Sequence, residues 1–366
     1  MALRWVSEFR NGRVAQRLIE RIAEIADREC TLMEVCGTHT MAIARFGIRQ
    51  MLPNSVRLIS GPGCPVCVTA QSDIDRFIAI GQVDGVVLAT FGDMVKVPGS
   101  QFSLRDARTY GIDVRVVYSP FEAVELARQM PDREVVFMAI GFETTAPGIA
   151  LSIIQAENER LRNFFIYPAN KLVPPAMKAL LSFDDVRIDG FLCPGHVSTI
   201  IGMRPYEPIA TDYGKPCVIA GFEPLDILQA VLMLLMQIRS GQAKVENQYR
   251  RAVRPEGNEA ARRLIDEVFE PQAVEWRGLG IIEESGLKLR RKYEHFDARL
   301  TFDVQVPQTK EHPACQCGEI LRGAALPTDC KLFATACTPD HPIGPCMVSS
   351  EGACAAYYRY REVSLS

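Results

Sequence analysis

The chain has 366 residues and a formal net charge of -3, from 41 Lys and Arg against 44 Asp and Glu. Its 48% hydrophobic and 23% charged residues are typical of globular proteins, and the balanced charge excludes the broad basic surface of a nucleic-acid-binding protein. The longest apolar run, 227–238, is shorter than the roughly 20 residues of a membrane span and predicts a buried helix. Charges within residues 1–10 do not fit a signal peptide, so we expect a cytoplasmic protein that binds no membrane.

In chain order, an amphipathic helix is predicted over 11–28, where apolar and charged residues alternate at helical spacing. Short apolar runs then predict strands, and helical patterns such as 121–129 and 147–157 lie between them. The candidate strands are 31–35, 56–60, 85–90, 114–118, 135–140, 164–167, 190–192 and 217–220. Such alternation predicts an α/β fold with parallel sheets, and the length suits two units that divide near residue 130.

Beyond residue 240 the character of the sequence changes. A helical pattern covers 259–269, and 305–350 is rich in Pro, Gly and Cys with little regular periodicity. Loop-rich sequence with many thiols favours a third domain that is organised by a metal centre.

Four polar motifs begin where a predicted strand ends. They are Cys36-Gly-Thr-His-Thr, Gly61-Pro-Gly-Cys-Pro-Val-Cys, Gly141-Phe-Glu-Thr-Thr-Ala-Pro and Cys193-Pro-Gly-His-Val-Ser. Because ligands of open α/β sheets bind at the carboxyl ends of the strands, we expect these motifs to converge on one cleft. Each motif alone also fits an ordinary Gly/Pro turn, and a lone histidine such as His196 is more often structural. Four such turns that carry Cys, His and Glu favour a functional site.

The chain has twelve cysteines, and clustered thiols in a reducing cytosol indicate metal binding or redox chemistry. Six lie near the C-terminus, and four of these form a widely spaced set: Cys315, Cys330, Cys337 and Cys354. The set lacks the close pairs typical of structural zinc, which favours a four-iron cluster. Cys317 and Cys346 are left over and could each replace a neighbour as ligand, while His312 and His341 keep a zinc site open.

The N-terminal motifs offer several kinds of chemistry. Cys64 and Cys67 have the spacing of a reversible disulfide pair, although with Cys36 and His39 they could instead complete a zinc site. Cys36 and His39 lie three residues apart, which suits a shared metal or a nucleophilic thiol with an imidazole base. Glu143 either caps the helix that follows it or moves protons in the cleft.

Taken together and in this order, these motifs and the C-x14-C-x6-C-x16-C tail closely resemble the HypD family of hydrogenase maturation factors, over about residues 30–360. The resemblance implies a role in building the Fe(CN)2CO group of [NiFe] hydrogenases, during which the protein holds iron in a stable complex with HypC. Cyanide would arrive from HypE, with HypF upstream. The implied fold is α/β, with two doubly wound (Rossmann-like) parallel-sheet domains and a smaller, loop-rich iron–sulfur domain. We expect the domains at 25–130, at 131–240, and at 241–366 together with an N-terminal helix, 1–24.

The resemblance also implies roles for individual residues. Cys36 would be the iron ligand, shared with a thiolate of HypC, and the other candidate catalytic residues are His39, Cys64, Cys67, Glu143 and His196. Cys64 and Cys67 would form the redox pair, with Glu143 and His196 beside the iron. A [4Fe-4S] cluster bound by Cys315, Cys330, Cys337 and Cys354 would pass electrons to that pair.

Three functions can be distinguished at this point. The first is a redox-active assembly scaffold, which is not a conventional turnover enzyme and which requires Cys36 and HypC. The second is a cluster-dependent thiol–disulfide reductase that acts on a protein substrate through Cys64 and Cys67 and does not need Cys36. The third is a colourless, zinc-stabilised interaction protein.

Overall fold

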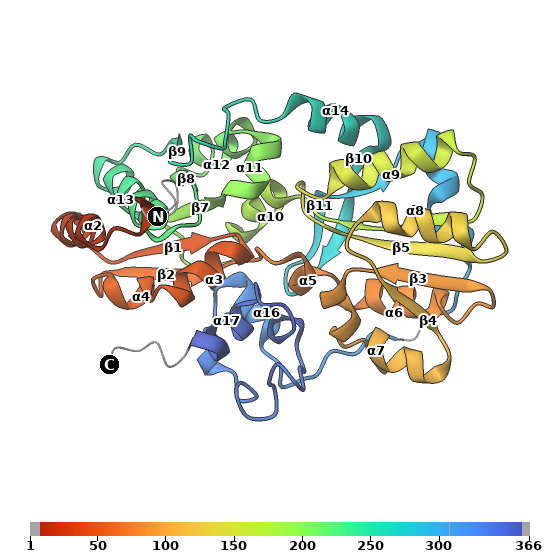
Figure 1. The fold of residues 1–366 in the computed structure, drawn as a ribbon. Helices are drawn as coiled ribbons and strands as arrows, with labels where there is room; N and C mark the ends of the chain where they lie inside the picture. The colour runs from red at the N-terminus through yellow and green to blue at the C-terminus, as the bar shows by residue number, and fades with distance from the viewer. Residues whose placement is uncertain (1–7, 307, 361–366) are drawn as a thin grey trace.

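The computed structural model describes residues 8–306 and 308–360 and contains two parallel β-sheets, a β-hairpin and a cysteine-rich C-terminal segment. The two sheets lie side by side, and the C-terminal segment packs beneath the first sheet and the junction between the two (Figure 1). This arrangement confirms the predicted α/β class with two Rossmann-like sheets.

The first sheet has five parallel strands in the spatial order β2-β1-β7-β8-β9. They are β1 (Cys30–Glu34), β2 (Val56–Ser60), β7 (Gly190–Pro194), β8 (Cys217–Ala220) and β9 (Val245–Asn247). One face packs against α2 (Gly12–Ile25), α3 (Gly37–Arg45), α4 (Ile48–Met51) and α13 (Pro224–Ser240). The other face contributes to a larger core with α11 (Gly195–Ile201), α12 (Glu207–Thr211) and α16 (Cys317–Arg322).

The second sheet has four parallel strands in the order β4-β3-β5-β6. They are β3 (Val86–Thr90), β4 (Asp113–Val116), β5 (Glu134–Gly141) and β6 (Phe164–Asn170). Helices α8 (Pro120–Gln129) and α9 (Ala146–Asn158) cover one face, and α6 (Gln71–Ile80), α7 (Leu104–Ala107) and α10 (Val173–Leu180) cover the other. Because helices bury both faces, β3, β5 and β6 are nearly continuous apolar runs, which is why the sequence revealed them.

Helix ends follow the local sequence. The Ser119 side chain accepts a hydrogen bond from the N–H of Phe121, and Pro120 occupies the first turn of α8. Helix α13 runs from Pro224 to Ser240 and is followed by Gly241, whose φ of 68° is a conformation that glycine adopts without steric cost. This helix contains the apolar run 227–238, and its burial confirms that prediction.

The predicted domain boundaries do not follow the sheets. Strands β1 and β2 fall in the predicted first domain, but β1 pairs with β7 of the predicted second domain, so both strands share one sheet with β7 and β8. Strands β3 to β6 form the other sheet and are inserted between β2 and β7. The division at residue 130 is therefore replaced by a discontinuous first unit and an inserted second unit. Nothing local in a buried apolar strand specifies which neighbour it pairs with.

The third predicted region is also smaller than expected. Helix α2 packs against α13 of the first unit, not against the C-terminal segment, and Arg10 forms an ion pair with Glu223 at the start of α13. Residues 245–247 join the first sheet, whereas α14 (Glu259–Val268) packs on α9 of the second unit. The antiparallel hairpin of β10 (Phe269–Trp276) and β11 (Gly280–Leu289) contacts α10 and β6.

The remaining short elements connect these parts. They are α5 (Pro65–Val68), α15 (Ala298–Thr301), α17 (Ala353–Tyr360), η1 (Glu8–Arg10), η2 (Gly92–Lys96), η3 (Arg108–Tyr110), η4 (Arg204–Tyr206), η5 (Arg291–Phe296), η6 (Pro327–Asp329) and η7 (Pro345–Met347). Within the described ranges, no helix combines the length and apolarity needed to cross a bilayer. Most of the 1–10 stretch used in the signal-peptide argument, residues 1–7, lies outside the described residues.

Candidate iron and thiol site

The Cys36 and His196 motifs follow two neighbouring strands, β1 and β7. The strand order of the first sheet reverses between these two strands, because β2 lies beyond β1 on one side while β8 and β9 follow β7 on the other. Such a switch point, at the carboxyl ends of parallel strands, is the usual ligand position in this class of fold. The topology thus places both motifs at the expected edge.

Cys36 is buried at the N-terminus of α3, with 7% of its surface exposed. Burial raises the pKa of its thiol to about 12, although the backbone N–H groups of His39 and Thr38 lower the pKa in part. The nearby carboxyl groups of Glu351 and Glu34 raise it further. Without a bound cation Cys36 is therefore a neutral thiol, and a metal ion that binds there must displace its proton.

Glu34 is a fully buried carboxyl group beneath Cys36. Its oxygens accept hydrogen bonds from the Cys36 N–H at 3.1 Å and the Thr40 hydroxyl at 2.5 Å. Burial raises its pKa to about 7, and hydrogen bonds from Thr40 and Ser60 oppose that rise. Glu34 thus fixes the backbone at Cys36, a role the sequence analysis missed. The signal was a charged residue at the end of an apolar strand.

His39 uses one ring nitrogen to contact the backbone, while its buried Nδ1 has no hydrogen-bond partner among the described residues. Its ring is fully buried, and Nε2 lies 3.0 Å from the Gly221 carbonyl oxygen and 3.3 Å from that of Ala220. Burial lowers its pKa to about 4, so the ring is neutral and Nε2 donates to these carbonyls. His39 therefore anchors α3 to the end of β8.

His196 lies in the first turn of α11 and retains an exposed face. Its ring packs against Phe222 at a centroid distance of 4.0 Å, and Phe222 also contacts the ring of His39 at 4.8 Å. Partial burial lowers the pKa of His196, while the charge of Glu351 acts to raise it.

Glu351 is the most informative residue that the sequence analysis missed. It precedes α17 in the C-terminal segment, accepts a 2.6 Å hydrogen bond from the Thr38 hydroxyl and packs against Gly37. Its charge affects Cys36, His196 and the Cys64/Cys67 pair. Its only sequence signal was its position three residues before Cys354. The C-terminal segment therefore supplies a carboxylate to the Cys36 site.

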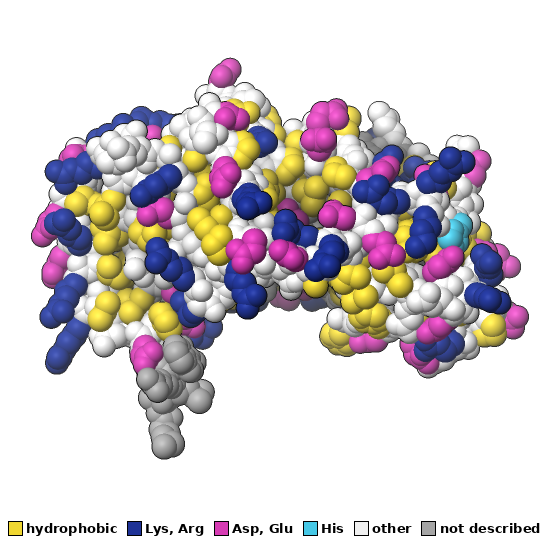
Figure 2. Space-filling view, turned by 90° about the horizontal axis from the view of Figure 1, so that it is seen from above, with side chains coloured by type: hydrophobic (Ala, Val, Ile, Leu, Met, Phe, Trp, Pro, Cys, Tyr) yellow, Lys and Arg dark blue, Asp and Glu magenta, His cyan; other side chains and the backbone are white. Residues whose placement is uncertain are grey.

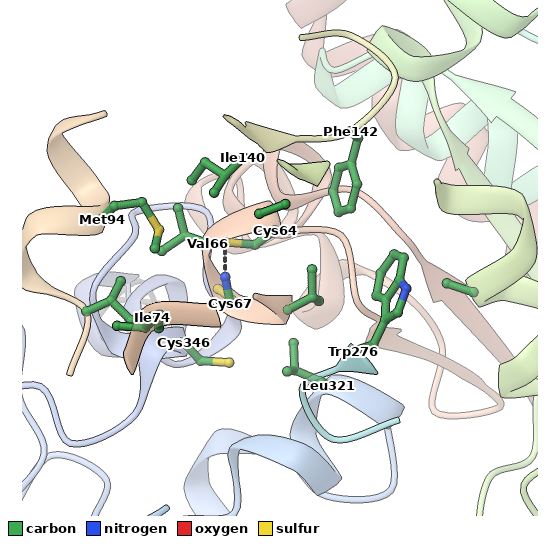
Figure 3. Close-up of a cluster of buried hydrophobic side chains, with 14 of the residues drawn as sticks. Cys64, Val66, Cys67, Ile74, Met94, Ile140, Phe142, Trp276, Leu321 and Cys346 are labelled. Atoms are coloured by element: carbon green, nitrogen blue, oxygen red, sulfur yellow. Dashed lines mark hydrogen bonds between the residues drawn. The ribbon is translucent and has the colours of Figure 1, made fainter. Parts of the chain in front are cut away.

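The loop of Cys64 and Cys67 lies directly against the Cys36 loop. The Gly37 N–H donates to the Gly63 carbonyl at 2.8 Å, and a Cβ on Gly63 would lie 2.1 Å from the Cys36 nitrogen. Cys64 caps α5, and its sulfur accepts a 3.4 Å hydrogen bond from the Cys67 N–H (Figure 3). Both thiols are buried. The two N-terminal motifs thus form one compact site.

The thiols of Cys317, Cys346 and Cys354 extend this group of neighbouring sulfur atoms into the C-terminal segment. Cys346 Sγ lies 2.7 Å from Cys317 Sγ, and it also interacts with the sulfurs of Cys67 and Cys354. Burial acts to raise the pKa of Cys67, but the contacts from Cys346 and Cys64 outweigh it, so the pKa falls below its usual value. The pKa of Cys64 is raised by burial and by Cys67. Cys346, which the sequence left without a role, is the link between the two groups of thiols.

The predicted cluster ligands lie near this link. The sulfurs of Cys330 and Cys337 both affect the pKa of Cys315, which burial raises to about 12, and Cys337 also affects Cys354. The Ile343 N–H donates to Cys337 Sγ at 3.3 Å, the kind of contact that tunes cluster sulfurs. A Cβ on Gly344 would lie 2.7 Å from Cys315 Sγ, so glycine lets the loop pass close to the thiols. Cys317 and Cys346 interact with the same sulfurs, so all six C-terminal thiols lie close together, and thiolate sulfur is the donor that a [4Fe-4S] cluster requires.

A single zinc ion requires its ligands around one point. Across residues 8–306 and 308–360, no three His, Cys, Asp or Glu side chains are arranged to hold one metal ion. A four-iron cluster spreads its thiolates over separate iron atoms and does not require such a point.

Glu143 occupies a different position. Its neighbour Phe142 stacks on Trp276 in the same buried group as Cys64 (Figure 3), but no hydrogen bond of the described residues joins Glu143 to Cys36 or His196. Glu143 lines a separate cavity between α10, α11 and α14. Three of the four motifs therefore surround Cys36, whereas the Glu143 carboxyl group faces elsewhere.

Comparison with known proteins identifies the family. The family model named HypD and described as "Hydrogenase formation hypA family" matches residues 13–361. The hydrogenase maturation factor HypD of Azotobacter vinelandii is 51% identical over 367 residues, which cover 98% of this chain and 97% of that protein. The chain belongs to the HypD family of hydrogenase maturation factors.

Two further relatives cover the chain to a similar extent. HypD of Cupriavidus necator is 48% identical over 368 residues, covering 98% of this chain and 97% of the relative. HypD of Rhodobacter capsulatus is 46% identical over 370 residues, covering 98% of both. The match includes the whole site and both groups of cysteines, so the resemblance drawn from the motifs is confirmed at the level of the family.

Proposed function

We propose that this chain is the scaffold on which the Fe(CN)2CO group of a [NiFe] hydrogenase is assembled. Cys36 would bind the incoming iron as a thiolate, a soft donor suited to iron with diatomic ligands. The observation that carries the proposal is the direct contact between the Cys36 loop and the Cys64/Cys67 loop, from which buried thiols lead to the C-terminal cysteines. A binding thiol beside a redox pair supports an assembly site.

The residues around Cys36 support this use. Iron binding there would expel the thiol proton, because the pKa of free Cys36 is about 12. The Glu351 carboxylate, whose charge acts on both Cys36 and the partly exposed His196 ring, could accept this proton, and Glu351 or His196 could complete the coordination of the iron. A further ligand would come from HypC, whose thiolate we propose for this role. HypE would deliver cyanide, with HypF upstream.

Cys315, Cys330, Cys337 and Cys354 would hold a [4Fe-4S] cluster, which would supply electrons to the nearby thiols when bound. Cys317 and Cys346 form the pair between this set and Cys67. In thiol–disulfide exchange, the Cys346 sulfur would attack Cys67 of an oxidised Cys64–Cys67 pair and release Cys64. Because the pKa values of both Cys346 and Cys64 are raised, the proton lost by Cys346 would end on the departing Cys64 sulfur. Cys317 would then attack Cys346 and release Cys67, so that one disulfide forms while another breaks.

Two variants test the path of electrons. The double variant C317S/C64S leaves Cys346 between Cys67 and Cys354, which the cluster would occupy, and it should accumulate a Cys346–Cys67 disulfide under mild oxidation. Peptide mapping by mass spectrometry detects that bond. Variant C317S/C217S is the matched control, because Cys217 is buried in β8 and packs beside Cys193. If the double variant forms no such bond, Cys346 does not exchange with Cys67 and the proposed path between the two groups of thiols is wrong.

The second candidate function is a cluster-dependent reductase for a protein disulfide. It is favoured only by the row of neighbouring thiols from Cys64 to the C-terminal cysteines. It predicts that Cys36→Ala retains full turnover of a disulfide substrate in the absence of HypC. The buried Cys64 and Cys67 sulfurs argue against it, because a protein substrate needs access to at least one attacking thiol.

A further inference from the structure

A cavity of about 520 Å3 lies between α10, the η4–α12 segment, α14 and the β10–β11 hairpin. Its volume is that of a small-molecule site, and junctions between structural units are common places for such sites. The walls are mainly apolar and include Pro174, Pro175, Pro205, Pro208 and Leu287. Figure 2 looks onto this face, where hydrophobic side chains gather near the middle and charges of both signs surround them.

Glu143 is the buried polar residue in the wall of this cavity, with 3% of its surface exposed. One oxygen, Oε1, accepts a hydrogen bond from the Val173 N–H at 3.0 Å. The other, Oε2, is buried and has no partner among the described residues. An unpaired buried acceptor costs free energy, so its retention in a cavity wall indicates a ligand that donates a hydrogen bond. Burial raises the pKa of Glu143 to about 7, which suits a neutral ligand better than a cation.

The same cavity is lined by an unpaired donor. Arg262, on α14, contributes to the wall, and its Nε is buried without a partner among the described residues. The other charges that line the cavity are Lys178 and Arg204 against Glu256 and Asp266, so they do not favour one sign of ligand strongly. The unmatched polar atoms are thus one acceptor and one donor in apolar surroundings.

We propose that this cavity binds a neutral carboxamide attached to an apolar body. A carboxamide N–H would donate to Glu143 Oε2, and its carbonyl would accept from Arg262 Nε, while the apolar body packs against the prolines and Leu287. This binding site is separate from the Cys36 site and goes beyond the proposed scaffold function. A carboxamide is available from a free small molecule or from an Asn or Gln side chain of a docked protein.

Saturation-transfer NMR with the full chain tests the proposal, with benzamide and acetophenone as probes. The two probes share the ring and the carbonyl, but only benzamide carries the N–H donor. Benzamide should bind about tenfold more tightly than acetophenone, because only benzamide pairs the buried oxygen. In Glu143→Gln, a near-isosteric change that presents an NH2 donor to the ligand, this preference should vanish. Glu125→Gln, on the surface of α8, is the matched control and should keep it.

A blocked peptide, acetyl-Leu-Gln-methylamide, identifies the source of the carboxamide. Tighter binding of the peptide than of benzamide would assign the site to a protein side chain, and weaker binding would assign it to a free small molecule. The proposal is overturned if neither benzamide nor the peptide binds saturably, if acetophenone binds as well as benzamide, or if Glu143→Gln keeps the preference while its thermal melting curve shows a folded chain.

Discussion

Replacing Gly63 with alanine should disrupt the contact on which the proposed site depends. The new Cβ would lie 2.1 Å from the Cys36 nitrogen and 2.4 Å from its Cα, whereas ordinary contacts of a Cβ begin near 3.4 Å. Both neighbours are backbone atoms, so no side-chain rotation can relieve the overlap. The two loops would have to separate by about 1.3 Å, the difference between 3.4 Å and 2.1 Å.

The cost follows from two contributions. Forcing extra atoms into a packed contact costs roughly 1–3 kcal/mol. The separation also breaks the hydrogen bond from the Gly37 N–H to the Gly63 carbonyl, at roughly 0.5–1.5 kcal/mol. The free energy of unfolding of the first unit should therefore fall by about 2–4 kcal/mol.

Urea unfolding followed by circular dichroism measures this loss, and iron content after anaerobic loading reports on Cys36. Gly148→Ala is the matched control, because its Cβ would approach only a Pro120 carbon at 3.9 Å. Alanine in that helix should be neutral or stabilise by up to about 1 kcal/mol. If Gly63→Ala unfolds at the wild-type urea concentration and retains iron, the loops do not meet as described.

Three other predictions concern separate parts of the chain. Burial raises the pKa of Glu143 from 4.5 to about 7, so the folded chain binds more protons than the unfolded chain in that interval, and stability falls as the pH rises through it. A glutamine at this position does not titrate. The difference in the free energy of unfolding between Glu143→Gln and wild type, measured by urea unfolding, should therefore change by up to about 3 kcal/mol between pH 5 and pH 8. If the stabilities of the two proteins change in parallel with pH, the raised pKa of Glu143 is refuted. Cys354→Ala should lose the visible absorbance of the reconstituted cluster. Cys193→Ala, which removes a packed thiol in β7, should retain it. Equal iron and sulfide contents in these two variants would contradict the assignment of Cys354 as a cluster ligand. Cys346→Ser should slow the reduction of an oxidised Cys64–Cys67 pair by a low-potential donor, as measured by alkylation and mass spectrometry, and an unchanged rate would exclude Cys346 from the path.

The sequence predicted the buried parallel strands well, for a physical reason. Strand β5 is apolar along almost its whole length because helices cover both of its faces, and this pattern is visible in a single segment. The β10–β11 hairpin was missed because its alternate residues face solvent and its turn carries no strong two-residue signal. The discontinuous first unit was missed because pairing of β1 with β7 joins residues about 160 positions apart.

The site was predicted to a similar extent. The strand-end rule placed Cys36 and His196 correctly at one edge, because the position of a motif relative to its strand is a local property. The approach of Cys346 to Cys67 and of Glu351 to Cys36 depends on how the C-terminal segment folds under the sheets. Spacing along the chain carries no information on such contacts.

Infrared spectroscopy of the chain purified anaerobically in complex with HypC can show whether Cys36 holds iron with its diatomic ligands. Cyanide and carbonyl stretching bands are expected in the wild-type complex and should be lost in a Cys36→Ala complex that retains its cluster. Bands that persist in Cys36→Ala, or a wild-type complex that holds its cluster but shows no bands, would contradict the assignment of Cys36 as the iron ligand of an assembly scaffold.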